Sequence, residues 1–417
     1  MRIIFKNLFS LGFIHGINLA IPLLVTPYLV KNTGLDTFGI ISAAQNFASF
    51  FFLITDYGFN LTAVRRIAQA RDNQQEIESI IKGVVSLKLA LLLFSFLLFV
   101  IFTSVVPNFR EYFFIYFGSF ALVIGQALLP LWYYQGMEKI SKTIAPVVFF
   151  KILTICLIFL IIKNKSDSPF VNVLFGAGNI LTGSYLFVMM SRSHKISFKN
   201  ITKEIFRKEL KDGFPVFSSN IGVALYSNSP LIILSFFVSP ATLGIYSVAD
   251  RIIQILKGLL ALVHQVTYPR ICNIVLHSKE SLESFIKKIY SIVWLGVFLI
   301  CLFIFFKPQI IIFHFIKNET DLNFASQVLK YLSFVLFVTS LNMPFYQTLL
   351  AYRKDWINVK ILFAAALFSI ALNILLVPVY SINGIIVSFY IVETMVTLSI
   401  IYSLFYFKKN HEQRKLY

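Results

Sequence analysis

The chain has 417 residues, of which 58% are hydrophobic and only 13% are charged, and its mean hydropathy is +0.78. Soluble domains are about half apolar and a quarter charged, so this composition excludes a water-soluble protein. A formal net charge of +18 would suit a nucleic-acid-binding protein. The basic residues are instead divided among short segments between apolar runs, which excludes that class as well.

Twelve apolar runs follow one another along the chain, each long enough to cross a bilayer. A spanning helix needs about 20 apolar residues to cross a hydrocarbon core of roughly 30 Å. The first run follows Arg2 and Lys6, but it is longer than the apolar part of a signal peptide, so we expect a retained helix. A short external helix is expected after Pro308. The predicted spans are 8–30, 38–61, 83–105, 112–135, 143–162, 170–190, 214–238, 243–268, 286–306, 324–350, 356–377 and 384–406.

The distribution of lysine and arginine predicts the orientation of these spans. If the amino terminus is inside, 26 of the 37 basic residues fall in the inner segments, six in the outer segments and five within the spans. This asymmetry follows the positive-inside rule. We therefore expect a multi-pass membrane protein, with both termini in the cytoplasm and with anionic lipids around the inner segments.

The two halves of the sequence resemble each other. Residues 37–44 (TFGIISAA) return as residues 242–249 (TLGIYSVA), with five of eight positions identical at an offset of 205. The same offset carries Arg65 onto Arg270. The repeats begin the second and the eighth spans, six spans apart, so both halves face the same way and are predicted to be parallel repeats.

The segment between the halves has a helical pattern of its own. In residues 196–212, apolar residues such as Phe206 and Leu210 recur at helical spacing while lysines and arginines occupy the other positions. This predicts an amphipathic helix on the inner membrane surface. The predicted organisation is a six-helix lobe at 1–191, a linker at 192–212, a second six-helix lobe at 213–407 and a basic tail at 408–417.

Polar residues form stripes along several predicted spans. On the eighth span, Asp250, Gln254 and Lys257 recur every three or four residues and share one face. The repeat carries this face onto the second span, where it includes Gln45 and Asp56. The first and seventh spans add Asn18 and Asn220. Such faces cannot point at lipid without unsatisfied polar groups, so we expect them to face each other or a watery cavity.

Charged residues inside the spans are the strongest functional candidates, because each would cost roughly 2.5–3.5 kcal/mol at a helix centre. Asp56 and Lys88 lie at similar depth in neighbouring spans and fit a structural ion pair or a substrate role. Lys330 is near the outer surface and fits a snorkelling side chain. Asp250 and Glu393 could titrate or neutralise neighbours. The remaining candidates for a cationic cavity that would attract an anionic cargo are Lys151, Arg251 and Lys257.

The sequence contains no pattern for a metal or a cofactor. Cys156, Cys272 and Cys301 fall in or next to apolar runs without metal-ligand spacing, and no P-loop pattern is present to bind ATP. We expect neither a cofactor nor a metal site.

Several segments resemble the Wzx-type O-antigen flippases of the multidrug, oligosaccharidyl-lipid and polysaccharide exporter superfamily. The resemblance extends over essentially the whole chain, and the region that ends the fourth span is its most specific part. The segments that carry it are 34–39 (GLDTFG), 56–59 (DYGF), 65–68 (RRIA), 130–139 (PLWYYQGMEK), 243–250 (LGIYSVAD) and 268–271 (YPRI).

This resemblance implies an all-α fold of about twelve transmembrane helices in two pseudo-symmetric lobes around a central cleft. The implied function is transport and not catalysis. The cargo would be a polyprenyl-diphosphate-linked oligosaccharide, flipped from the cytoplasmic to the outer leaflet by alternating access during O-antigen (lipopolysaccharide) or similar polysaccharide biosynthesis. Other polysaccharide assembly proteins would be the partners, and no nucleic acid.

Two alternatives remain open. An ion-coupled drug antiporter of the same fold would be expected to have an acidic cavity, whereas the charges within these spans are mostly basic. A membrane glycan polymerase or acyltransferase would need a catalytic constellation, and His15, His264 and His314 do not lie in an obvious one. The external loops are also short for a polymerase.

Overall fold

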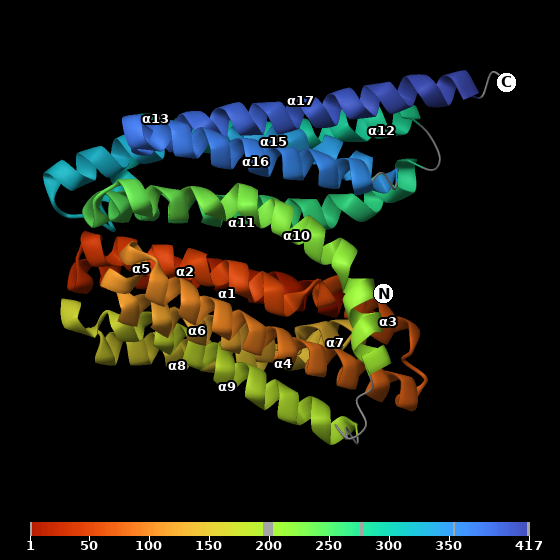
Figure 1. Cartoon of the computed structure of the whole chain (residues 1–417). Helices are drawn as coiled ribbons and strands as arrows, with labels where there is room; N and C mark the ends of the chain where they lie inside the picture. The colour runs from red at the N-terminus through yellow and green to blue at the C-terminus, as the bar shows by residue number, and fades with distance from the viewer. Residues whose placement is uncertain (1, 195–202, 276–278, 353–354, 415–417) are drawn as a thin grey trace. The chain divides into compact units, whose positions relative to one another are not determined.

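The computed structural model describes residues 2–194, 203–275, 279–352 and 355–414, and these residues contain helices but no strand. Figure 1 shows the chain. In the first half the α-helices are α1 (Arg2–Thr33), α2 (Leu35–Asp56), α3 (Phe59–Gln69), α4 (Gln74–Val105), α5 (Pro107–Glu111), α6 (Phe113–Leu128), α7 (Leu131–Gly136), α8 (Ile144–Ile161) and α9 (Pro169–Ser193), with the short η1 (Ile140–Thr143) and η2 (Lys165–Asp167). The remainder comprises α10 (Lys203–Phe237), α11 (Pro240–Val275), α12 (Lys279–Phe285), η3 (Ile286–Tyr290), α13 (Ser291–Phe306), α14 (Pro308–Ile312), α15 (Glu319–Ala351), α16 (Asp355–Tyr380) and α17 (Ile382–Arg414).

The helices match a polytopic membrane protein. Eleven helical stretches among the described residues are long and apolar enough to cross a bilayer. The helix α11 has a spanning length of 36 residues but is not among them, and its middle contains Asp250, Arg251 and Lys257. The eleven stretches and α11 together correspond to the twelve predicted spans. The short helix expected after Pro308 is confirmed as α14.

Two predicted spans are interrupted, which corrects their description as single helices. The span predicted at 38–61 breaks at Tyr57 and Gly58, whose φ angles of 45° and 82° are left-handed. The span predicted at 112–135 breaks at Pro130, because proline has no N–H to donate to the helix ladder. The second segments of the two broken spans, α3 and α7, pack against each other.

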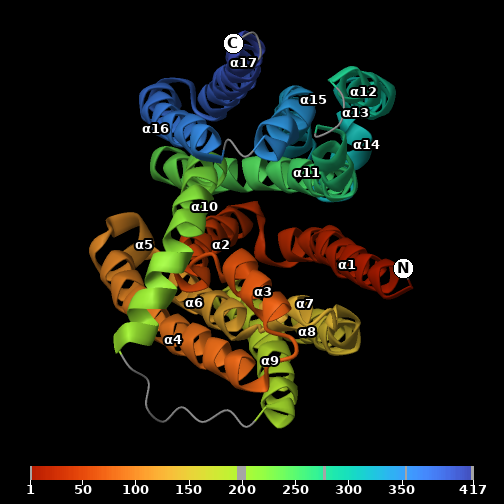
Figure 2. The same ribbon diagram turned by 90° about the vertical axis from the view of Figure 1, so that its right-hand side faces the viewer.

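The chain divides into two compact units, Met1–Ile221 and Gly222–Tyr417. In the first unit α2 packs on α6, and in the second α11 packs on α15, which are the elements that the offset of 205 relates. Figure 2 shows α11 and α15 side by side in the second unit. The repeated segments at 37–44 and 243–249 are buried throughout, so close packing within each unit accounts for their similarity.

The helix α10 is continuous from Lys203 to Phe237, so the residues of the predicted linker from 203 onward are not a separate surface helix. Residues 195–202 of that linker lie outside the described residues. The part of α10 before Gly222 belongs to the first unit. Its Phe206 packs against the main apolar core of that unit. The predicted Leu210 is exposed, and Glu209 occupies the buried side of the helix instead.

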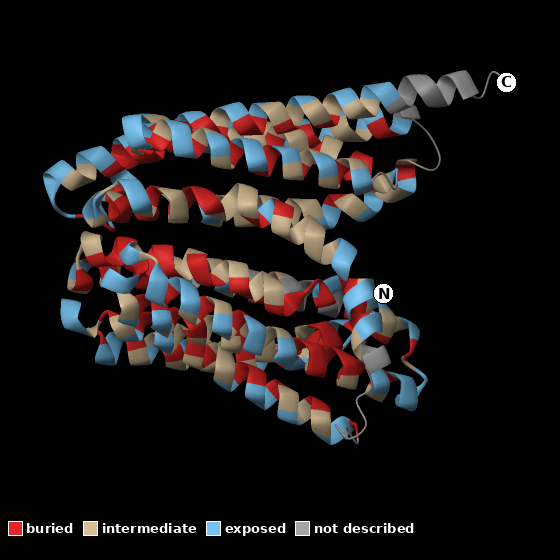
Figure 3. Cartoon of the chain, viewed as in Figure 1, coloured by how far each residue is buried: buried red, intermediate tan, exposed pale blue. Residues whose placement is uncertain are grey.

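Buried and exposed residues alternate along every long helix, as Figure 3 shows. Large apolar side chains are exposed on many of them, such as Leu93 on α4, Leu160 on α8 and Leu375 on α16. A water-soluble surface would not expose so much continuous apolar area. These sides of the helices are therefore suited to contact lipid, whereas polar residues such as Asp56 and Glu393 lie on packed sides.

Candidate functional site

The polar stripe of α11 is present in the second unit. The Gln254 side-chain amide donates to the Asp250 carboxylate over 3.3 Å. The ammonium of Lys257 lies 5.6 Å from the centre of the Phe389 ring on α17. Arg251 and Lys257 also lie within electrostatic reach of Asp250. The predicted face thus brings an acid, a cation and an amide together on one helix, and Arg251 lies next to them in the sequence.

Glu393 adds a second carboxylate to this region. It is only 2% exposed and is four residues after Phe389 on α17, so both share one face of that helix. The side-chain amide of Asn342 on α15 donates to Glu393 over 3.4 Å. The Tyr226 hydroxyl of α10 lies beside the carboxylate without the geometry of a hydrogen bond. A buried carboxylate with such long contacts is a group that a cation could stabilise.

In the first unit, Asp56 and Lys88 form a buried pair. The Lys88 ammonium lies 3.4 Å from the Asp56 carboxylate, and the two residues are 5% and 8% exposed. They join α2 to α4. The contact matches the ion pair that the sequence left open as one of two readings, and it leaves little unbalanced charge at this depth.

Gln45 also has a partner that the sequence did not indicate. Its side-chain amide donates to the Asn172 side chain on α9 over 2.8 Å. Asn172 is completely buried and donates in turn to the Ile41 carbonyl over 3.4 Å. The polar stripe of α2 is therefore partly used in packing α2 against α9.

Other predicted residues are not brought into a cluster. Lys330 places its ammonium 4.2 Å from the centre of the Phe305 ring on α13, which is a cation–π geometry. Three further residues have no hydrogen bond or ion pair with any described residue. Lys151 on α8 and Asn220 on α10 are half-buried, and Asn18 on α1 is exposed.

A buried polar network in the second unit was missed by the sequence reasoning. The Tyr290 hydroxyl donates to the Gln347 side-chain carbonyl over 2.7 Å, and its oxygen lies 2.8 Å from the Thr267 hydroxyl. The Gln347 amide donates to the His264 carbonyl over 3.0 Å. The network joins α11, η3 and α15 in the middle of a membrane unit. Only the presence of a glutamine within an apolar span could have signalled it.

The sequence profile of a family described as "Polysaccharide biosynthesis protein" matches residues 4–275, which is more than half of the chain. The chain belongs to this polysaccharide biosynthesis protein family. The family resemblance expected from the sequence is therefore confirmed.

Two relatives of the chain carry the name "Putative O-antigen transporter". The protein from Escherichia coli (strain K12) is 29% identical over 395 residues, which are 94% of this chain and 94% of that protein. The protein from Shigella dysenteriae is 28% identical over 306 residues, covering 71% of this chain and 73% of that protein.

Solved structures show the fold. The lipid II flippase MurJ in an inward closed conformation has a TM-score of 0.75 at 15% identity and covers 95% of this chain and 86% of that one. An inward-facing multidrug resistance transporter of the MATE family, in the MOP superfamily, has a TM-score of 0.70 at 13% identity and covers 95% of both chains. This member of the polysaccharide biosynthesis family therefore has the MATE- and MurJ-like membrane fold that the resemblance implied.

Proposed function

We propose that the protein flips a polyprenyl-diphosphate-linked oligosaccharide from the cytoplasmic to the outer leaflet of a bacterial inner membrane. The observation that carries this proposal is the similarity, over 94% of both chains, to a protein named as an O-antigen transporter. A transporter role, and not an enzymatic one, agrees with that name. The fold shared with a lipid II flippase gives independent support, because lipid II is also a lipid-linked precursor.

The buried charges supply a chemical reason for such a cargo. Arg251, Lys257 and Lys151 are half-buried cations in apolar surroundings, where attraction to a diphosphate is weakly screened. Lys88 contributes less, because Asp56 balances it. Asp250 and Glu393 limit the positive charge of the second unit, so we assign the diphosphate to Arg251 and Lys257, with Gln254 as a hydrogen-bond donor to sugars.

Alternating access would expose these residues to each side in turn. Both termini would lie in the cytoplasm, and the diphosphate would move outward, from the cytoplasmic leaflet to the outer leaflet. A lipid diphosphate carries about two negative charges, and a potential of 100 mV, negative inside, favours its outward movement by roughly 4–5 kcal/mol. Membrane potential can therefore bias the direction without ATP. Release to polysaccharide assembly proteins at the outer leaflet would complete the step.

One observation favours a second candidate function, ion-coupled export of small molecules. The MATE-family neighbour is a multidrug resistance transporter, and Glu393 is a buried carboxylate that a cation could occupy. Export of a cationic dye that is lost on Glu393→Gln would favour this candidate. Under the flippase proposal, the same cells show no dye export above the background of the host.

The test is complementation in a bacterium that makes O-antigen but lacks its flippase. We expect expression of the protein, together with the matching glycan synthesis enzymes, to restore surface glycan and to lower the amount of lipid-linked precursor that accumulates at the inner leaflet. Normal membrane levels of the protein without either change would contradict the proposal. Measurement of the precursor separates a failure of flipping from a failure of glycan synthesis.

A further inference from the structure

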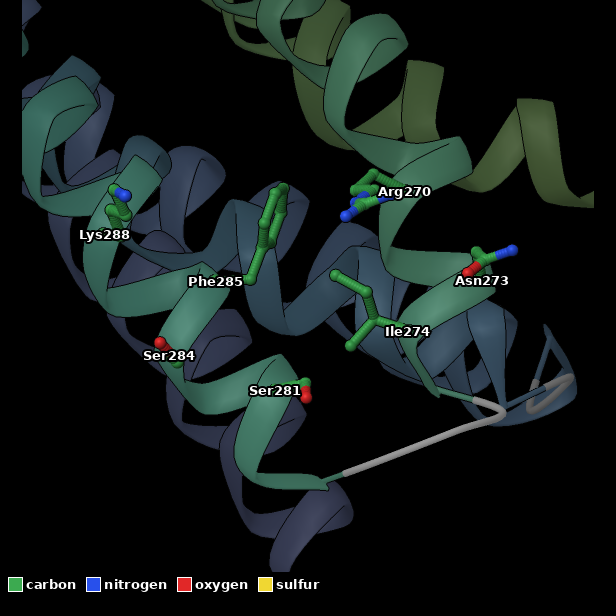
Figure 4. Close-up of a pocket in the computed structure, with 7 residues that line it drawn as sticks. All are labelled: Arg270, Asn273, Ile274, Ser281, Ser284, Phe285 and Lys288. Carbon is green, nitrogen blue, oxygen red and sulfur yellow. The ribbon is translucent and has the colours of Figure 1, made fainter.

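A pocket of about 560 Å³ lies in the second unit, between the end of α11 and the segment α12–η3 (Figure 4). The residues that line it are Arg270, Asn273, Ile274, Ser281, Ser284, Phe285 and Lys288. In Figure 4, Arg270 and Ile274 extend from α11 toward Phe285 across the space between the two helices. The pocket is separate from the polar stripe around Asp250 and Lys257, because it lies beyond it toward the end of α11.

The lining combines two kinds of surface. Ile274 and Phe285 are apolar and also belong to a packed core cluster of the unit, so they form a fixed apolar wall. Arg270 and Lys288 carry positive charge, and Asn273, Ser281 and Ser284 provide neutral hydrogen-bond donors. Among the described lining residues there is no carboxylate. Cations and donors beside an apolar wall are what a phosphate group attached to a hydrocarbon chain requires.

Two arginines in the equivalent region of the first unit have carboxylate partners. In α3, Arg66 pairs with Glu209, and Arg71, two residues after the end of that helix, pairs with Glu138. The sequence offset of 205 makes Arg65 the equivalent of Arg270, and Arg65 is exposed and has no ion pair with a described carboxylate. Neither Arg270 nor Lys288 has an ion pair with a carboxylate whose side chain is described. The basic residue recurs in both units, and in the second unit it lines the pocket without a described carboxylate partner.

The position along the helices indicates where such an anion would be. The pocket lies at the end of α11 and at the start of the span Ser281–Phe306, at the level where membrane spans reach the headgroups. Lys287 and Lys288 are exposed there. A free phosphate would make no use of the wall formed by Ile274 and Phe285, whereas a lipid phosphate would use both surfaces.

We propose that this pocket binds the phosphate-bearing headgroup of a membrane lipid. The shared chemistry is a phosphate ester on a hydrocarbon chain, which either an anionic phospholipid or a polyprenyl diphosphate carrier supplies. The site goes beyond the proposed function, since lipid can bind here without being flipped. It holds lipid phosphate at the membrane surface next to the transporter.

The test uses the full-length protein in detergent and measures lipid binding by native mass spectrometry. The three lipids are phosphatidylglycerol, sugar-free polyprenyl diphosphate and diacylglycerol, which has no phosphate. The variants are Lys288→Gln, Arg270→Gln and Arg270→Gln/Lys288→Gln. The matched control is Lys287→Gln, which removes the same charge from the adjacent exposed residue that does not line the pocket.

We expect the double variant to bind at least one phosphate lipid about thirtyfold more weakly, since two basic residues near a lipid surface together contribute about 2 kcal/mol. Lys287→Gln should stay within about twofold of wild type. Loss confined to phosphatidylglycerol or to polyprenyl diphosphate identifies the natural source. Three results would overturn the site. The first is unchanged binding of both phosphate lipids by the double variant. The others are that Lys287→Gln loses as much binding as the double variant, or that the double variant loses diacylglycerol binding to the same extent.

Folding is controlled separately. Arg270→Lys retains the charge and is expected to retain most of the phosphate-lipid binding, and thermal unfolding of all variants is compared without lipid. If Arg270→Lys loses binding as completely as Arg270→Gln while its unfolding is unchanged, charge at this position is not what binds the lipid, and the proposal fails.

Discussion

Both carboxylate oxygens of Glu209 lie 2.7 Å from one guanidinium nitrogen of Arg66, and Glu209 is only 2% exposed. This pair joins the first half of α10 to α3, although the two residues are 143 positions apart in the sequence. The stacked rings of Tyr57 and Phe217, with centres 4.5 Å apart, strengthen the same junction. The start of α10 is thus an integral part of the first unit and not a loose linker.

The Arg66–Glu209 pair should be important for stability. Glu209→Gln leaves the partly buried Arg66 without its counter-charge, so we expect a clear fall in the midpoint of thermal unfolding. In a double-mutant cycle with Arg66→Met, the coupling should be about 1–3 kcal/mol, because the two residues are in direct contact. A coupling near zero, measured by unfolding of the purified variants, would mean that the pair does not fasten α10.

The Asp56–Lys88 pair can be tested for a structural role against a substrate role. Lys88→Met leaves Asp56 buried and uncompensated, which costs roughly 3–5 kcal/mol for such pairs. We expect Asp56→Asn/Lys88→Met to recover most of this stability and most of the surface glycan in the complementation strain. A double variant that is stable but exports no glycan would instead assign the pair to the cargo.

His194 makes stability depend on pH. Its Nε2 lies 2.7 Å from the Tyr133 hydroxyl, and its Nδ1 has no hydrogen-bond partner among the described residues. Burial lowers the pKa of His194 below the ordinary value of 6.5, and the charge of Lys139 lowers it further, while Glu78 opposes this. The unfolded chain therefore takes up a proton at a higher pH than the folded protein does.

It follows that acid destabilises the protein through this residue. The stability that the neutral His194 contributes to the folded protein is fully present above about pH 6.5 and is lost as the pH falls below that value. We expect the unfolding midpoint of wild type to fall between pH 7.5 and pH 5, and to fall less in His194→Gln. Identical pH profiles for the two proteins would show that His194 does not titrate with folding.

Substitution of Lys257 tests most sharply whether the cationic residues bind the cargo. Lys257→Ala removes the cation next to Phe389, and we expect surface glycan formation to fall about tenfold or more, because a charge-assisted hydrogen bond contributes about 1.5–3 kcal/mol. Lys317→Ala is the control, since Lys317 is exposed and lies over Phe313 far along the sequence from the stripe. Equal export by both variants at equal expression would remove Lys257 from the cargo site.

The sequence predicts the helices well because apolar length determines membrane spans directly. It also predicts the polar face of α11, since Asp250, Gln254 and Lys257 follow helical spacing within one element. The repeat at 37–44 and 242–249 similarly predicts which helices occupy equivalent places. These features depend on neighbours in the chain, and the sequence contains all of the necessary information.

Partners from distant helices could not be predicted in the same way. Nothing near Gln45 indicates Asn172, and nothing near Gln347 indicates Tyr290. Glu209 stands among basic residues and resembles a solvated position of a surface helix, although Arg66 holds it in the interior. The break at Tyr57 and Gly58 depends on close approach as well, because a Cβ atom on Gly58 would lie 2.7 Å from the Cβ of Val216.

Flipping by the purified protein in proteoliposomes is the most direct test of the proposed transport of a lipid-linked oligosaccharide. A polyprenyl-diphosphate-linked oligosaccharide is placed in both leaflets, and its access to an enzyme or lectin added outside is followed over time. We predict that the protein makes the inner pool accessible. The rate should be higher when the potential drives the anion outward and much lower with Lys257→Ala. An inner pool that stays inaccessible with folded, correctly inserted protein at any potential would contradict it.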